Sequence, residues 1–197
     1  MRLQFHDCAV RVHASILLNH TGSERLAAAS MTLMGFELID YIKAALKKSC
    51  PGTTSCTDIL TSAATDETVA AGGPFWMVPY RRRDGWVSVA AETQNVPMGY
   101  ENTDTLYLGG THDREVHERI NPGRYKTTTT ARASPTLPST REEDGAPAHG
   151  PTNPIVAAFV NEPFFFYQQF SVSMVKLGNI DILTSNEGEV RTNLDRP

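Results

Sequence analysis

The densest group of chemically reactive side chains lies at the start of the sequence, in RLQFHDC, residues 2–8. Arg2 and His6 are four residues apart, so on a helix they share one face, whereas Asp7 points elsewhere. A guanidinium beside an imidazole suits a reaction that moves a proton and stabilises a developing anion in the same pocket. Taken alone, the same two residues are more often a surface arginine and an ordinary helical histidine, and it is the rest of the sequence that favours a site.

Apolar residues at helical spacing predict the elements that hold these side chains. We expect a helix over residues 2–18, with its polar side displaying the histidines to solvent. His13 and His20 continue the seven-residue spacing from His6, and we expect them to be solvated. A second helix over 35–48 is the most amphipathic, and a third begins with a capping pattern at Ser55 and stops at Gly72. A last helix carries one apolar face and stops at 178–179. The residues of that face are Phe166, Phe170, Met174 and Leu177.

The connections between these helices contain no strong strand signal, so the predicted fold class is mainly α. Residues 75–99 mix prolines, arginines and aromatics without a period and are predicted to be irregular, with Arg81-Arg82-Arg83 structural and Asp84 as their nearby partner. Residues 121–153 hold five prolines and four consecutive threonines, which predicts a disordered linker. The phenylalanines at 164–166 are expected to pack in the core.

Composition excludes several function classes. The chain has 197 residues with 18 Lys+Arg against 22 Asp+Glu, a formal net charge of -4, and no basic run longer than 81–83, which disfavours nucleic-acid binding. No stretch approaches the ~18 apolar residues of a membrane helix, and the polar pair His6-Asp7 interrupts any export signal at the start of the chain. Three cysteines allow at most one internal disulfide.

Several blocks in order resemble the plant secretory haem peroxidases, the class III family. The block RLQFHDCAV is similar to the family signature R-L-x-F-H-D-C-x-V, and the likeness continues through GFELIDYIKAALKKSCPGTTSCTDIL, AAGGPFWMVP and RRDG. It resumes in DTLYLGGTH and in MVKLGNIDILTSNEGEVRTN. The resemblance covers residues 1–120 and 152–194. It implies a haem-peroxidase-like helical fold with a distal and a proximal lobe, here incomplete.

The resemblance implies a monomeric enzyme that reduces hydrogen peroxide at haem b and oxidises small phenolic donors, as in oxidative-stress and cell-wall or lignin chemistry. His6 would be the distal base and Arg2 would stabilise charge as the O–O bond breaks. Phe5 would pack over the haem, and Pro97 would lie near the donor at the haem edge. His112 would be the axial iron ligand. The family is found in the extracellular space, cell wall or vacuole, but we expect no signal peptide in this chain.

The resemblance also implies calcium. The distal family site falls on Asp7, the carbonyl of Val10 and the hydroxyl of Ser15, with Glu24 as a water-linked supporter, all oxygen donors of the kind that Ca²⁺ takes. The loop at Val12-His13 is one residue shorter than the family pattern and lacks a carboxylate. On the proximal side, Asp113 stands where the family has a threonine ligand.

Further departures keep a second hypothesis open, a truncated, non-catalytic peroxidase remnant with weak or no haem binding. The family's N-terminal helix and its proximal region are absent, and 21–36 contains no asparagine to orient the distal histidine. By resemblance, Cys50 would pair upstream of Met1, Cys8 with a deleted cysteine, and Cys56 with the position of Leu194. The predicted organisation is a distal lobe over 1–99, a proximal ligand segment over 104–120, the linker over 121–153 and a helical segment over 154–197.

Overall fold

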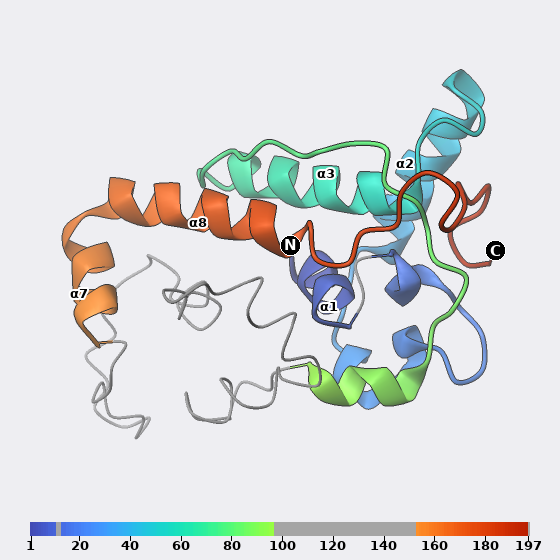
Figure 1. Ribbon diagram of the computed structural model, residues 1–197, viewed down its shortest axis with the longest axis horizontal. Helices are drawn as coiled ribbons and strands as arrows, with labels where there is room; N and C mark the ends of the chain where they lie inside the picture. The colour runs from blue at the N-terminus through green and yellow to red at the C-terminus, as the bar shows by residue number, and fades with distance from the viewer. Residues whose placement is uncertain (11–12, 97–152, 197) are drawn as a thin grey trace.

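The computed structural model describes residues 1–10, 13–96 and 153–196, and in them the fold is mainly helical, as predicted (Figure 1). The expectations for Pro97, His112, Asp113 and the segments 104–120 and 121–152 lie outside the described residues. The described part has no sheet, only one isolated antiparallel bridge between Asp84 and Glu189. The α-helices are α1 (Arg2–Val10), α2 (Phe36–Ser49), α3 (Cys56–Ala70), α7 (Asn153–Asn161) and α8 (Pro163–Leu177), and the 3-10 helices are η1 (Ser15–Leu17), η2 (Glu24–Leu26), η3 (Ala28–Ser30) and η4 (Ala90–Asn95).

Helices α2 and α3 confirm the second and third predicted helices. Gly35 precedes α2 in the left-handed conformation, at φ 98°, which glycine adopts without strain. Ser55 caps α3, since its hydroxyl accepts the backbone N–H of Asp58 at 3.1 Å. Both helices bury apolar residues in a core shared with α1, η1 and the C-terminal segment; its members include Leu3, Leu17, Ile39, Ile59 and Leu194.

The prediction of one helix over residues 2–18 is wrong, because α1 ends at Val10. Ala14 has a left-handed backbone, at φ 53°, and η1 follows as a separate turn. The Asp7 carboxylate accepts the N–H groups of Ala14 and Ile16, which turns the chain back instead of continuing the helix. The expected solvated histidine face is therefore wrong in part: His20 is exposed, but His6 is buried, and the half-buried His13 imidazole contacts the carbonyl of Asp181.

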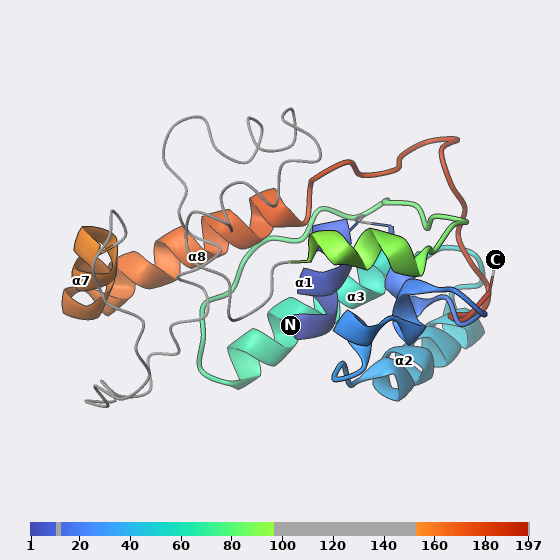
Figure 2. The same ribbon diagram turned by 90° about the horizontal axis from the view of Figure 1, so that it is seen from below.

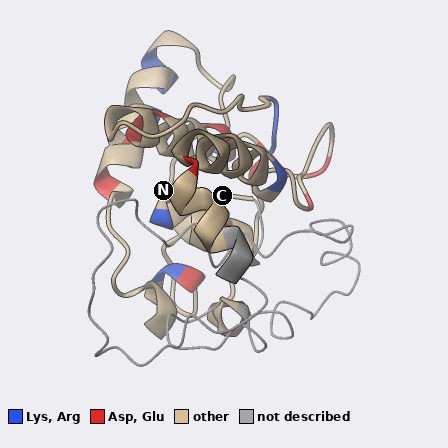
Figure 3. Cartoon of the chain, turned by 90° about the vertical axis from the view of Figure 1, so that its left-hand side faces the viewer, with Lys and Arg blue, Asp and Glu red and all other residues tan. Residues whose placement is uncertain are grey.

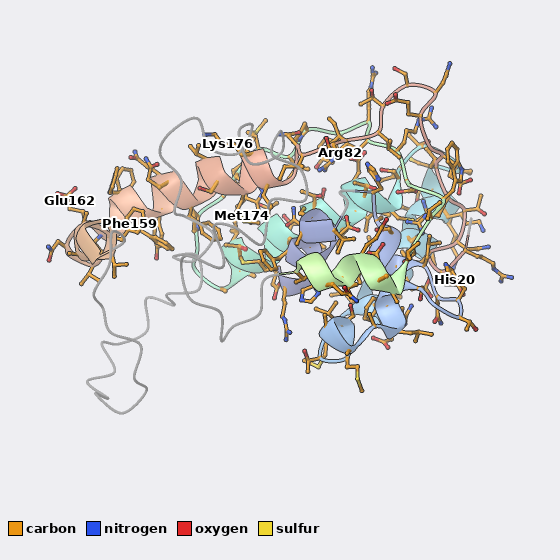
Figure 4. All side chains as sticks on the ribbon, turned by 60° about the horizontal axis from the view of Figure 1, so that its bottom comes forward. His20, Arg82, Phe159, Glu162, Met174 and Lys176 are labelled. Atoms are coloured by element: carbon orange, nitrogen blue, oxygen red, sulfur yellow. The ribbon has the colours of Figure 1, made fainter. Side chains whose placement is uncertain are left out.

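Helix α8 confirms the predicted apolar face and its stop before Gly178. Phe170 and Met174 are buried against Trp76, whose ring lies edge-on to Phe170 at 5.8 Å between centroids. Figure 4 labels Met174 on the half of α8 that lies near α1 and α3, and Phe159 on α7, beyond the other end of α8. Figure 3 looks at these two helices from their far side and shows few charged residues on them.

The expectation that phenylalanines 164–166 form core is wrong in part. Phe164 is 72% exposed and Phe165 is 39% exposed, whereas Phe166 is half-buried and contacts Phe159 and Phe170. Of the three, only Phe166 packs against the cluster that contains Trp76 and Phe170, and α7 is the helix that contacts this part of the chain.

Two buried acids organise the irregular stretch after α3. Asp84 is fully buried, and its carboxylate accepts the backbone N–H groups of Cys56, Thr57 and Arg191. Arg82 forms its ion pair with Asp58 at 3.0 Å, not with its neighbour Asp84. Arg82 is structural as predicted, but Asp84 is not its partner, because the Asp84 carboxylate already binds the backbone N–H groups of Cys56, Thr57 and Arg191.

Candidate distal active site

The candidate site is built on α1, which lies in the middle of the described fold and contacts α3, η1 and η4 (Figure 2). Leu3 packs one side of the helix against the apolar core, and His6 and Asp7 are buried on other sides of it. Phe5 is half-buried and Arg2 is exposed. The hydrophobic contacts of Leu3 thus fix the direction in which the polar residues of the same helix point.

His6 is the candidate base. Its side chain is 4% exposed, and its Nδ1 atom is buried without a hydrogen-bond partner. The Phe5 ring lies edge-on to the imidazole, 6.1 Å away between centroids. Burial, followed by the positive charge of Arg2, lowers the pKa of His6. A neutral imidazole ready to accept a proton is the state that results at neutral pH.

The unpartnered Nδ1 atom agrees with the sequence, which offers no asparagine between residues 21 and 36 to accept its proton. An acceptor at this nitrogen fixes the tautomer and orientation of an imidazole. Within the described residues, no side chain therefore fixes the tautomer or the ring orientation of the buried His6.

A second polar cluster lies beside the base and joins α1, η1 and η2. Asp7 accepts the N–H of Ala14 at 3.0 Å, and the hydroxyl of Ser15 donates to Glu24 Oε2 at 3.0 Å. Asp7, Ser15 and Glu24 are all essentially inaccessible to solvent. The other oxygen of Glu24, Oε1, is buried without a hydrogen-bond partner.

Burial disfavours the ionised forms of the two carboxyl groups of this cluster. Burial and the nearby Glu24 raise the pKa of Asp7 to about 8. Burial raises the pKa of Glu24 to about 7, against the hydrogen bond from Ser15. A cation placed among these oxygens would favour the ionised forms of both groups.

The donor set suits Ca²⁺, which takes carboxylate, hydroxyl and carbonyl oxygens. The structure brings together Asp7, Ser15 and Glu24, three of the residues predicted for the distal calcium site. Val10, whose carbonyl was the fourth, ends α1 and is half-buried. Across the residues that the structure describes, no group of three or more His, Cys, Asp or Glu side chains could hold a metal ion, so a calcium ion here would depend on hydroxyl and backbone oxygens.

Sequence reasoning missed the role of Ser88 in this cluster. Its hydroxyl accepts the backbone N–H of Glu24 at 3.0 Å, which ties η2 to the stretch that precedes η4. The two residues are 64 positions apart, and no local pattern links them. Of the predicted site residues, Arg2, Phe5, His6 and Asp7 all lie on α1. Pro97, His112 and Asp113 lie outside the described residues.

Comparison with known proteins decides the family. The peroxidase family model matches residues 1–140, which is most of the chain. The chain belongs to the plant class III peroxidases. It is 33% identical to Peroxidase 7 of Arabidopsis thaliana over 253 aligned positions, covering 97% of this chain and 72% of that protein. It is 48% identical over 127 positions to Peroxidase 39 of the same plant and 46% identical over 108 positions to Peroxidase N of Armoracia rusticana.

The length of this peroxidase differs from that of its relatives. The match covers 61% of this chain but 39% of Peroxidase 39, and 54% of this chain but 33% of Peroxidase N. The 253 positions aligned with Peroxidase 7 exceed the 197 residues of this chain, so the relative has residues that this peroxidase lacks. None of the described helices is long and apolar enough to cross a membrane.

Proposed function

We propose that this peroxidase reduces hydrogen peroxide and oxidises small phenolic donors, with Arg2 and His6 as its catalytic residues. The observation that carries the proposal is the buried imidazole of His6 on the same helix as Arg2, with its pKa lowered by burial and by the Arg2 charge. A bound haem b would supply the iron that binds peroxide and the electrons that cleave its O–O bond. We expect His112 to hold that iron, Phe5 to pack against the porphyrin and Pro97 to lie beside the donor.

The side chains of α1 supply the proton chemistry. A neutral His6 accepts the proton of one peroxide oxygen at Nε2 and then donates it to the departing oxygen, which leaves as water. The Arg2 guanidinium stabilises the negative charge that develops on that oxygen. Such a base contributes ~10²–10⁴-fold to the rate of a reaction that needs proton transfer.

We further propose that the cluster beside α1 holds calcium through the side chains of Asp7 and Ser15 and the carbonyl of Val10, with Glu24 in support. Two buried carboxyl groups with raised pKa values, next to an unpartnered Glu24 Oε1, support this assignment. Asp113 is the proposed proximal counterpart. By family, the protein acts as a monomer outside the cell or in the vacuole.

Titration of the purified chain with ferric haem tests the proposal. We expect a sharp Soret band that saturates at one haem per chain and is lost in His112→Ala. Turnover of a guaiacol-type phenol should fall about 10²-fold or more in His6→Ala. His20→Ala is the matched control, because His20 is exposed on the surface and should leave both the spectrum and the rate unchanged.

The same titration examines the non-catalytic alternative, which the unpartnered Nδ1 of His6 and the three free cysteines favour. Losing the partner of such a ligand or base commonly lowers affinity or activity ~10–100-fold. Featureless haem binding that is indifferent to His112→Ala would reject the enzyme and leave the remnant.

A further inference from the structure

One sequence motif takes no part in the proposed haem chemistry. The chain contains a single Asn-X-Ser/Thr triplet in which X is not proline, and it is Asn19-His20-Thr21. Such a triplet is the acceptor for an asparagine-linked oligosaccharide in secreted proteins, where it lies in a surface loop. Because a pattern of three residues also arises by chance, its place in the fold decides whether it is an acceptor.

The triplet lies in the loop between η1 and η2. The four residues before it, 15–18, are fully buried, whereas all three residues of the triplet are exposed. Figure 4 labels His20, its middle residue, at the end of the molecule opposite to α7. The chain therefore leaves the interior directly before the asparagine, and the structure meets the requirement for a surface loop.

Main-chain hydrogen bonds hold this loop in place. The Asn19 N–H donates to the Asp195 carbonyl at 2.9 Å, and the Ser23 N–H donates to the His20 carbonyl at 3.0 Å. The second bond closes a β-turn whose third residue, Gly22, has φ 82°, which glycine adopts without strain. The loop therefore keeps its course without using the side chains of the triplet.

The side chains that the acceptor needs make no other hydrogen bond. Within the described residues, neither the Asn19 amide group nor the Thr21 hydroxyl is hydrogen-bonded. The hydroxyl stands two positions after the asparagine, as the acceptor pattern requires. An oligosaccharide on Asn19 Nδ2 would extend into solvent and would break no hydrogen bond of the described fold.

We propose that Asn19 carries an asparagine-linked oligosaccharide, which the loop between η1 and η2 presents on the surface of the folded chain. The inference rests on the proposed location outside the cell or in the vacuole, since the transfer takes place on chains that enter the secretory pathway. It is independent of haem and calcium, because neither Asn19 nor Thr21 is assigned to those sites.

The transfer is balanced with one co-reactant, a lipid-linked oligosaccharide diphosphate, which a membrane-bound transferase brings to the chain. A bond forms between Asn19 Nδ2 and the anomeric carbon of the first sugar. The bond between that carbon and the diphosphate oxygen breaks, and the lipid diphosphate leaves. The amide nitrogen loses one proton to a base of the transferase, and nothing is oxidised or reduced.

The test uses the full chain behind a cleavable secretion signal, translated with microsomes, and analyses only the chains that the microsomes protect from protease. We expect one band of lower mobility, which a peptide N-glycosidase removes. Because that enzyme converts the modified asparagine to aspartate, mass spectrometry should find aspartate at position 19. The shift should be lost in Asn19→Gln and Thr21→Val and kept in Thr21→Ser, which retains the hydroxyl.

Asn193→Gln is the matched control. Asn193 is also an exposed asparagine, but no Ser or Thr stands two positions after it, so its substitution should leave the shift unchanged. A second measurement treats the purified chain with the glycosidase in the absence of denaturant. Because Asn19 is exposed, the sugar should be released as completely as from the denatured chain.

Three results would overturn the proposal: protected wild-type chains without sugar, a shift that persists in Asn19→Gln, or a sugar that is released only after denaturation. Since the added signal directs the chain into the microsomes, these results do not depend on its natural location. They also involve no haem and no turnover, so a failure here is distinguishable from a failure of the proposed peroxidase activity.

Discussion

Two buried acidic centres of this peroxidase are built in opposite ways. Asp84 lies among donors: three backbone N–H groups, the Thr57 hydroxyl at 3.0 Å and the nearby Arg191 guanidinium. Burial raises the pKa values of both Asp7 and Glu24, and a nearby acid adds to each shift: Glu24 for Asp7 and Glu92 for Glu24. A fully satisfied charge holds the fold together, whereas an unsatisfied pair suits the binding of a cation.

The largest expected effect is at the satisfied centre. Asp84→Ala should lower the free energy of unfolding by about 3–5 kcal/mol, because it leaves the Arg191 charge buried and the first N–H groups of α3 without an acceptor. Urea denaturation measures this change. Asp40→Ala, an exposed aspartate on α2, is the control and should change stability by less than about 0.5 kcal/mol. Equal effects of the two substitutions would remove the contrast between the centres.

A new disulfide next to the same centre should act in the opposite direction. Cys56 and Leu194 are buried in one apolar cluster, so Leu194→Cys should allow a bridge that adds about 2–4 kcal/mol. The raised pKa of Cys56 makes its thiol slow to react in the folded chain, so the bridge should form during oxidative refolding. Non-reducing mass spectrometry with urea denaturation measures it. A bridge that forms without added stability contradicts the expectation.

These two centres also show what the sequence could and could not predict. The caps and apolar spacing of α2 and α3 are local, so their bounds were predicted closely, and for α8 the stop at Gly178 was predicted but not its start at Pro163. The end of α1 at Val10 was not, because it depends on Asp7 accepting N–H groups from a later turn. The partner of Arg82 is likewise a tertiary choice, since Asp58 is 24 residues away.

Part of the candidate site could be predicted from the sequence in the same way, and part could not. The resemblance assigned Asp7, Ser15 and Glu24 to one site, and in the structure Ser15 donates to Glu24 while Asp7 accepts the N–H of Ala14, the residue before Ser15. That they hold calcium stays a proposal. No pattern in the sequence could indicate Ser88, whose contact with Glu24 is made only after the chain folds. Nor could spacing alone show that His6 is buried rather than solvated, because burial depends on what α1 packs against.

The unsatisfied pair should make stability depend on pH. The folded pKa values of Asp7 and Glu24, about 8 and 7, lie above their unfolded values, so their contribution is present at low pH and is lost as pH rises through the folded values. In calcium-free buffer, the free energy of unfolding should fall between pH 6.5 and 8.5, by up to about 1.4 kcal/mol per pH unit for each group.

The pH dependence also tests the proposed calcium site. Asp7→Asn should flatten the curve, and millimolar Ca²⁺ should raise stability at pH 8 in wild type but not in this variant. His6 has a lowered pKa and acts in the opposite direction at lower pH, which is why the measurement starts at 6.5. A wild-type curve that is flat, or that rises over this interval, contradicts the description of the pair.

The smallest expected effect on stability is at the N-terminus of α3, where a serine and a buried aspartate accept different backbone N–H groups. Ser55 accepts a single N–H, that of Asp58, whereas Asp84 accepts the N–H groups of the two residues between them. Ser55→Ala should therefore cost about 1 kcal/mol, the usual value of a lost N-cap, and leave the remaining N–H groups bound. Thermal denaturation against Ser49→Ala, an exposed serine at the end of α2, measures the difference. A loss as large as that of Asp84→Ala would mean that the cap, rather than the buried carboxylate, holds this end of the helix.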